Sequence, residues 1–267
     1  MLESATTVGV NAQEERKFYD DYYRRFLELP EHAMRCDREV MFSGLENPAD
    51  GNYERRRLFR AGLEQLLAEP LAGRKVLDYG CGTGNWGVLL ATEGAEVALL
   101  DLSPVAIEVG LRRARVHGVA ERVRGYARDA SDLGCFADGE FDLIHAGGSV
   151  HHTMKYPNAL EELVRVLKPG GKLVLVDTYG NNPLLNLARW VRQRLSREPK
   201  EAGEGIILSD REINRLRPHL SRIEFYPMNL LAMAKRLFRG RFESPLVRGV
   251  MAVLEKTDAV LLTLFPF

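Results

Sequence analysis

Hydrophobic and polar positions alternate along residues 74–177 in a pattern that predicts strands and helices in turn. Short apolar runs are separated by longer segments whose apolar residues recur at helical spacing. The expected strands are KVLDY, AEVALLD, RVRGYA, FDLIHAG and KLVLVD, and the expected helices are 85–93, 104–116 and 157–167. This alternation predicts an α/β fold with a doubly wound, mostly parallel sheet that helices cover on both faces.

Amphipathic segments on either side predict extra N-terminal and C-terminal helices. Residues 11–29 and 52–68 have helical periodicity, and the turn-rich stretch 43–52 between them predicts a loop. Further along, the expected elements are a helix after Asn-Asn-Pro at 181–183, a capped helix in SDREINRLRPHL, a sixth strand in SRIEFYPM, and helices at 229–239 and 245–264. The expected division is an N-terminal helical lid (1–70), a core (71–180) and a C-terminal part with a helical insertion that covers the substrate (181–267).

Composition and charge fit one α/β domain with additions and exclude a disordered or fibrous protein. The 267 residues are 45% hydrophobic and 28% charged, and 37 Lys and Arg balance 37 Asp and Glu. Residues 183–250 contain 14 basic and 7 acidic residues, a local balance of 14 − 7 = +7. One interpretation is that this segment is a solvated helical surface. The alternative is that its positive charge attracts an acidic partner or an anionic membrane.

Cysteine usage and hydropathy predict a cytoplasmic protein without an integral membrane segment. The three cysteines are widely spaced and form no CxxC pair, which favours a reducing compartment. The N-terminus lacks an apolar leader, and the apolar run 259–267 is too short to span a bilayer.

Polar residues end the expected strands and form the candidate site. Ligands of such sheets bind outside the carboxyl ends of the strands. The residues at these ends are Asp78, Asp101, Asp129, His145 and Asp177.

A glycine-rich turn follows the first strand in the sequence VLDYGCGTGNWG. Its G-x-G-x-x-G pattern suits a dinucleotide, whose diphosphate would lie against the turn. A carboxylate at Asp78 would disfavour that diphosphate by about 3 kcal/mol at roughly 5 Å and an effective dielectric near 20. The same carboxylate favours S-adenosylmethionine, which carries an ammonium and a sulfonium but no phosphate. Asp101, about 20 residues further on, suits the ribose hydroxyls of either cofactor class.

Five motifs together resemble those of class I S-adenosylmethionine-dependent methyltransferases. They are LDYGCGTGNWG, LLDLSP, ARDASDL, FDLIHAGGSVHHT and LKPGGKLVLVD, and they span about 71–177. The resemblance implies a Rossmann-like fold, S-adenosyl-L-methionine as cofactor and S-adenosyl-L-homocysteine as product. It is strongest to the group that methylates small molecules, including quinone-type and natural-product methyltransferases. That family's seventh strand is not obvious in this sequence, which leaves the sheet edge and a monomer or homodimer open.

The resemblance also implies which residues bind the cofactor. Asp101 would hold the ribose, Leu102 would pack on adenine, and Asp129 with Ala130 would read its amino edge. Trp86 would line the cleft or pack its helix on the sheet. The complete expected set is Asp78, Gly80, Cys81, Gly82, Gly84, Asn85, Trp86, Asp101, Leu102, Ser103, Asp129, Ala130, His145, Ala146 and Gly147.

His151 and His152 are the candidate catalytic residues. A phenol is mostly protonated at neutral pH, so a phenolic acceptor would benefit from a base, and histidine suits that task. The alternative is that one ring bonds the backbone and shapes the loop. Of the two, His152 is preferred. No metal site is expected, because Ala146, Gly147 and Gly148 supply no carboxylates there.

Aromatic and basic residues before the core are candidates for the acceptor site: Tyr22, Phe26, Tyr53 and Arg57. The predicted function is methyl transfer to a small molecule, with an oxygen nucleophile on an apolar or aromatic compound favoured. The alternatives are a cyclisation or rearrangement without methyl transfer and, less favoured, action on nucleic acid. The partner expected is a small-molecule substrate and not nucleic acid, and peripheral membrane contact stays open.

Overall fold

The computed structural model describes most of the chain: residues 2–154, 156, 158–180, 186–187, 190, 194, 208–238 and 240–264. These residues fall into two compact units. The first contains residues 2–38 and Gln65–Thr178, and the second contains Glu39–Glu64 and the described residues from Tyr179 onward. The N-terminal part predicted as 1–70 is therefore divided between the two units.

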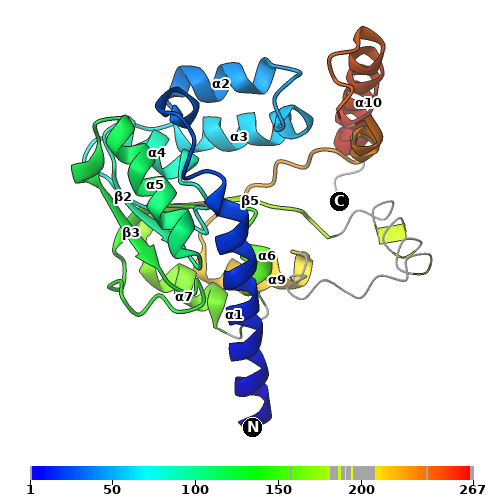
Figure 1. Ribbon diagram of the computed structural model, residues 1–267. Helices are drawn as coiled ribbons and strands as arrows, with labels where there is room; N and C mark the ends of the chain where they lie inside the picture. The colour runs from blue at the N-terminus through cyan, green and yellow to red at the C-terminus, as the bar shows by residue number, and fades with distance from the viewer. Residues whose placement is uncertain are drawn as a thin grey trace. The chain divides into compact units, whose positions relative to one another are not determined.

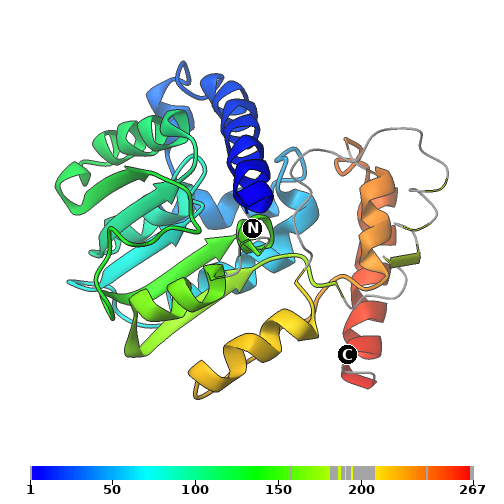
Figure 2. The same ribbon diagram turned by 90° about the horizontal axis from the view of Figure 1, so that it is seen from below.

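A five-stranded parallel sheet forms the centre of the first unit (Figure 2). Each strand pairs in parallel with its neighbours in the order β3-β2-β1-β4-β5. The strands are β1 (Lys75–Tyr79), β2 (Glu96–Asp101), β3 (Val123–Ala127), β4 (Phe141–Gly147) and β5 (Leu167–Val176). The strand order reverses direction between β1 and β4, which is where ligands of such sheets bind. The predicted fold class is confirmed.

Helices of the first unit pack beside this sheet. Figure 1 shows α5 along β2 and β3, and α1 packs in turn against α5. Pro104 at the first position of α5 and a Ser103 side chain that accepts from the Ala106 N–H start that helix. The elements are α1 (Leu2–Arg24), η1 (Glu31–Met34), α4 (Asn85–Thr92), α5 (Pro104–Val116), η3 (Ala120–Arg122), α6 (Val150–Thr153) and α7 (Ala159–Val166).

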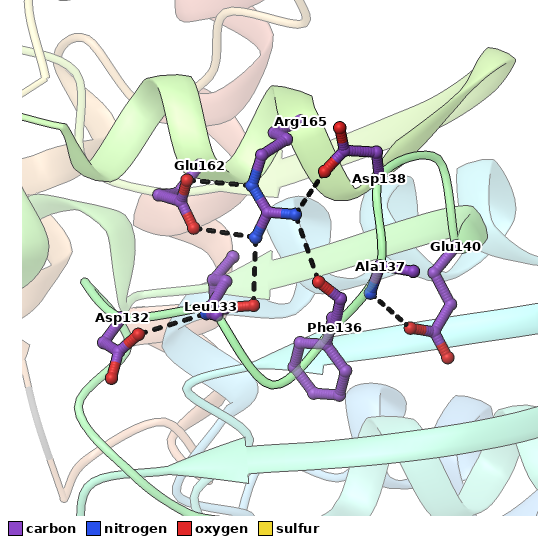
Figure 3. Close-up of polar contacts among 9 residues, drawn as sticks. Asp132, Leu133, Phe136, Ala137, Asp138, Glu140, Glu162 and Arg165 are labelled. Carbon is purple, nitrogen blue, oxygen red and sulfur yellow. Dashed lines mark hydrogen bonds and ion pairs between the residues drawn. The ribbon is translucent and has the colours of Figure 1, made fainter.

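Arg165 of α7 holds the loop that connects β3 with β4 (Figure 3). Its guanidinium donates to the carbonyls of Leu133 at 3.0 Å and Phe136 at 3.1 Å, and to the carboxylate of Asp138 at 2.6 Å. It also donates two hydrogen bonds to the Glu162 carboxylate, at 2.9 and 2.8 Å. These hydrogen bonds lower the pKa of Glu162. One side chain thus fixes the loop against α7.

The second unit is helical in its described part. A buried cluster of Tyr53, Phe242, Val247 and Met251, with Phe238 against it, forms an apolar core there. The elements are α2 (Arg38–Glu46), η2 (Tyr53–Arg55), α3 (Arg56–Leu66), α9 (Asp210–Leu216), η4 (Arg217–His219), η5 (Ala232–Phe238) and α10 (Pro245–Leu264).

Several predicted elements need correction. The sixth strand predicted at 221–228 is wrong: no strand forms there, and Phe225 and Tyr226 are half-exposed. Alternating apolar residues form a strand only where a partner pairs with the backbone, and among the described residues no strand does so. The predicted loop 43–52 begins later, because α2 continues to Glu46. Residues 232–238 form a 3₁₀-helix, α1 ends at Arg24, and most of the helix predicted after 183 lies outside the described residues.

Candidate functional site

The turn between β1 and α4 requires glycine at three positions. Gly80, Gly82 and Gly84 all have left-handed backbones, with φ of 66°, 53° and 73°. A Cβ on Gly80 would lie 2.3 Å from the Cβ of Ser149, and one on Gly84 would lie 2.9 Å from the Cα of Gly110. Backbone conformation and internal packing therefore account for Gly80 and Gly84 independently of any ligand.

Asp78 is buried beneath this turn, with 1% of its surface exposed. One carboxylate oxygen accepts the backbone N–H of Gly87 at 2.8 Å, and the other lies 2.7 Å from His145 Nδ1. The prediction assigned this carboxylate to a cationic cofactor. The structure gives both oxygens protein partners, so Asp78 joins β1 to α4 and β4.

His145 and Trp86 stack against each other behind the same turn. Their ring centroids are 4.6 Å apart and their planes differ by 15°. The Nε2 atom of His145 is buried and has no hydrogen-bond partner among the described residues. At the end of β4, Ala146 is buried and Gly147 is exposed. Trp86 therefore lies beside a predicted site residue and also packs α4.

Asp101 ends β2 next to the glycine turn. Its carboxylate accepts the backbone N–H groups of Gly82 and Ser103, both at 2.9 Å. Burial raises its pKa to about 6, although these two hydrogen bonds act in the opposite direction. Burial also raises the pKa of the Cys81 thiol well above its usual value, and the nearby charge of Asp101 adds to that shift.

Helix α1 covers this end of the sheet. Asp20 accepts the hydroxyl of Ser103 at 2.5 Å, and a Cβ on Gly82 would lie 3.1 Å from the Tyr23 hydroxyl oxygen. Burial, followed by the charge of Asp101, raises the pKa of Tyr23. Neither Asp20 nor Tyr23 is among the predicted cofactor or acceptor residues, although Tyr23 belongs to the aromatic surface of this helix, which was the available sequence signal.

Two predicted acceptor residues, Tyr22 near the end of α1 and Phe26 just after it, lie beside Arg25. Its guanidinium lies 4.1 Å from the ring centroid of Tyr22 and 4.8 Å from that of Phe26. Tyr22 is 44% exposed. The other two candidates lie in the second unit, where Tyr53 is buried in the apolar core and Arg57 donates to the backbone carbonyl of Glu255 at 3.3 Å.

Asp129 follows β3 in a tight polar turn. Its Oδ1 atom accepts both the N–H and the hydroxyl of Ser131, at 2.9 and 2.8 Å. Ala130 is buried, Leu102 is half-buried after β2, and Asn85 at the start of α4 accepts the Thr83 hydroxyl at 2.9 Å. Asp129 and Ala130 therefore lie just after β3 and Leu102 just after β2, while Asn85 begins α4.

Hydrogen bonds to β1 position the histidine pair. The Ser149 hydroxyl donates to the Tyr79 carbonyl at 2.6 Å, and the Tyr79 hydroxyl donates to Thr153 Oγ1 at 2.9 Å. These two contacts bracket α6 and hold His151 and His152 close to the end of β1.

The two histidines have different carboxylate partners. His151 Nδ1 lies 2.8 Å from an oxygen of Asp177, a carboxylate just after β5 whose side chain is 3% exposed. His152 Nδ1 lies 3.2 Å from Glu15 Oε1 of α1, within ion-pair distance but outside hydrogen-bond alignment. The Tyr19 hydroxyl is 3.4 Å from His152 Nε2. A buried carboxylate that orients an imidazole is the arrangement of a general base.

Comparison with known proteins identifies the central segment. Residues 76–171 match a family model described as a methyltransferase domain. This segment is a class I S-adenosylmethionine-dependent methyltransferase domain. The resemblance seen in the five sequence motifs is confirmed.

Relatives of this methyltransferase domain match it over part of their length. The chain is 37% identical over 120 residues to a demethylmenaquinone methyltransferase of Clavibacter sepedonicus, which covers 45% of this chain and 47% of that protein. It is 41% identical over 128 residues to an uncharacterized methyltransferase of Synechocystis sp., which covers 46% and 55%. The chain thus spans about half the length of the curated relatives it matches.

A solved structure resembles the fold over most of the chain. It is a geranyl diphosphate C-methyltransferase from Streptomyces coelicolor A3(2), with a TM-score of 0.54 and 21% identity. The match covers 90% of this chain and 93% of that one. At 21% sequence identity, this structural likeness supports the fold alone.

Proposed function

We propose that the protein transfers a methyl group from S-adenosylmethionine to a small-molecule acceptor and releases S-adenosylhomocysteine. The observation that carries this proposal is the oriented carboxylate of Asp101 beside the glycine turn, within a methyltransferase domain. Each of its oxygens accepts one backbone N–H and keeps further acceptor capacity. Two ribose hydroxyls can therefore donate to a carboxylate that the backbone already orients.

The residues around this carboxylate fit the rest of the cofactor. The left-handed turn at Gly80, Gly82 and Gly84 supplies backbone groups without side chains. The buried Nε2 atom of His145 offers a polar partner that the described protein residues leave unused. Asp129 and Ala130 would hold the adenine edge. When bound, the cofactor supplies a methyl group on a sulfonium, which is a good leaving group.

We further propose that His151 is the general base for an oxygen acceptor. A proton on Nδ1, donated to Asp177, leaves the lone pair on Nε2 to receive the proton of an acceptor hydroxyl. Such a base contributes roughly 10²–10⁴-fold to a rate. His152 is the base that the sequence favours, but Asp177 supports His151, and His152 Nδ1 lies within ion-pair distance of Glu15 of α1.

An apolar or aromatic acceptor fits the covering helix. Tyr19, Tyr22 and Tyr23 form a set of ring contacts on α1, with Tyr19 and Tyr23 stacked at 5.9 Å. The relative named as a demethylmenaquinone methyltransferase is in keeping with a quinone-type acceptor. A cyclisation without methyl transfer is the second candidate, and the product's mass separates it, since no methyl group would be gained.

Calorimetric titration with S-adenosylhomocysteine and, separately, NADH tests the cofactor. We expect micromolar binding of S-adenosylhomocysteine alone, and weaker binding in Asp101→Ala. Binding of NADH instead would refute the proposal. Acceptors are then screened by mass gain with the wild-type protein. A steep loss of RNA binding with added salt would identify a nucleic-acid function instead.

A further inference from the structure

The last helix of the second unit, α10, has an exposed apolar stripe. Leu246, Val250, Val253, Val260 and Leu264 are 78%, 38%, 64%, 59% and 65% exposed. With Thr257 they follow the spacing 4-3-4-3-4, which places them on one side of the helix. Over these 18 steps the stripe is about 27 Å long. Leu237 of η5, which packs beside α10, is 81% exposed as well.

The remaining exposed positions of α10 are small or uncharged, with one exception. Gly249, Ala252 and Ala259 border the stripe, and Lys256 is the one charged residue at an exposed position of this helix, which is described throughout. The outward face therefore combines a large apolar surface with one positive charge.

Both acidic residues of α10 point into the second unit. Glu255 pairs with Arg56 at 2.7 Å. Asp258 is fully buried and accepts the backbone N–H groups of Leu231 at 2.6 Å and Ala232 at 2.9 Å. These contacts fix which side of α10 faces outward, and they remove negative charge from that side.

The two hydroxyls on the outward face are satisfied within the helix. Thr257 donates to the carbonyl of Val253 at 2.9 Å, and Thr263 donates to the carbonyl of Ala259 at 2.7 Å. An apolar medium penalises polar groups that lack a hydrogen-bond partner. Apart from Lys256, the side chains of this face can enter such a medium without that penalty.

We propose that α10 lies on the surface of an anionic lipid bilayer, with this stripe among the acyl chains. None of the helices in the described part of the chain is long and apolar enough to span a membrane. An interfacial helix instead buries one face, and a lysine at its edge extends its stem to reach phosphate headgroups. A second copy of α10 fits less well, because neither copy exposes an acidic residue of this helix to pair with Lys256.

Vesicle flotation with the full chain tests this proposal. Vesicles of phosphatidylcholine are compared with vesicles that also contain phosphatidylglycerol, at low and high salt. We expect binding to the anionic vesicles that salt weakens. Lys256→Gln should weaken it roughly fivefold, and Val253→Glu at least about tenfold. Val40→Glu, at a 37% exposed valine of α2, is the matched control and should bind as the wild type does.

The outcomes separate this proposal from the proposed function. Thermal unfolding and S-adenosylhomocysteine binding should match the wild type in all three variants, because α10 holds none of the cofactor residues. No binding of the wild type to anionic vesicles would overturn the proposal, as would equal losses in Val253→Glu and Val40→Glu. A dimer in sedimentation equilibrium that Val253→Glu dissociates, without vesicle binding, would assign the stripe to a second copy instead.

Discussion

The imidazole of His151 and the carboxylate of Asp177 are in direct contact, with Nδ1 hydrogen-bonded to Oδ2 at 3.0 Å and 2.8 Å from Oδ1. His151 belongs to the short helix after β4, and Asp177 follows β5, so the contact joins two neighbouring strand ends. The Asp177 carboxylate also lies 3.3 Å from the backbone N–H of His151. Because the acid is buried, it can fix the ring's orientation and tautomer, which His152 does not obtain from Glu15.

Replacing His151 by Gln should lower kcat for an oxygen acceptor by roughly 10²–10⁴-fold, because the proton of the acceptor would lose its base. Asp177→Asn should lower kcat too, since an amide does not favour the same imidazole tautomer. Methyl transfer is measured by product mass, and S-adenosylhomocysteine affinity should be unchanged. His152→Gln is the control. A larger loss in that variant than in His151→Gln would make His152 the base.

Cofactor affinity should depend on pH through Asp101. We expect its ionised form to accept the ribose hydroxyls, so S-adenosylhomocysteine affinity should be constant above about pH 6 and fall as pH decreases below its pKa of about 6. Asp101→Asn should bind more weakly and lack this inflection. Calorimetry between pH 5 and pH 8 measures both. Affinity that stays constant through this range would exclude Asp101 as the ribose ligand.

The raised pKa of Asp101 also affects the stability of the cofactor-free protein. The folded pKa of Asp101 lies above its usual value of 3.8, so the fold favours the protonated carboxyl. Its contribution to stability is therefore fully present below about pH 4 and is lost as pH rises through about 6. Thermal unfolding should show Asp101→Asn gaining stability relative to the wild type as pH rises through this range. If the stability difference between Asp101→Asn and the wild type stayed constant with pH, the raised pKa of Asp101 would be contradicted.

The central sheet could be predicted from the sequence because its strands are short, apolar and bounded by turns. β1, β2 and the helix that starts at Pro104 agree with the expected boundaries. The position of Asp101 at a strand end beside the glycine turn could also be predicted from the sequence, whereas its role as a ribose ligand stays a prediction. Contacts between residues far apart in the sequence could not be predicted. Examples are the approach of Tyr23 to Gly82 and the contact between His145 and Asp78. The strand predicted at 221–228 failed for the same reason, since pairing is a property of the fold and not of the segment.

Arg165→Met should destabilise the first unit by about 1–2 kcal/mol. The loss includes hydrogen bonds to two loop carbonyls and two carboxylates, but its side chain is 27% exposed, so water compensates part of it. Urea unfolding measures the change, and amide hydrogen exchange should become faster in the loop before β4. Arg38→Met is the control, because the Arg38 pair with Glu93 lies at the surface and should contribute under about 1 kcal/mol. Equal losses in both variants would mean that the loop contacts add nothing.

Gly80→Ala should be more destabilising than an alanine at a glycine of the same conformation elsewhere. Gly80 and Gly118 have φ of 66° and 67°, so the left-handed backbone costs alanine a similar amount, about 1–2 kcal/mol, at both. At Gly118 nothing lies within 4 Å of the new Cβ, whereas at Gly80 it would lie 2.3 Å from the Cβ of Ser149. The overlap should add roughly 1–3 kcal/mol.

Urea unfolding of Gly80→Ala and Gly118→Ala isolates the steric part, because the backbone cost cancels in their difference. Ser149→Gly should recover some of the loss in the Gly80→Ala background, although it removes the Ser149 hydrogen bond to the Tyr79 carbonyl in either background. A double-mutant cycle therefore measures the contact itself. If the two alanine variants unfold with the same free energy, the turn does not pack against Ser149, and its glycine would then be explained by backbone conformation alone.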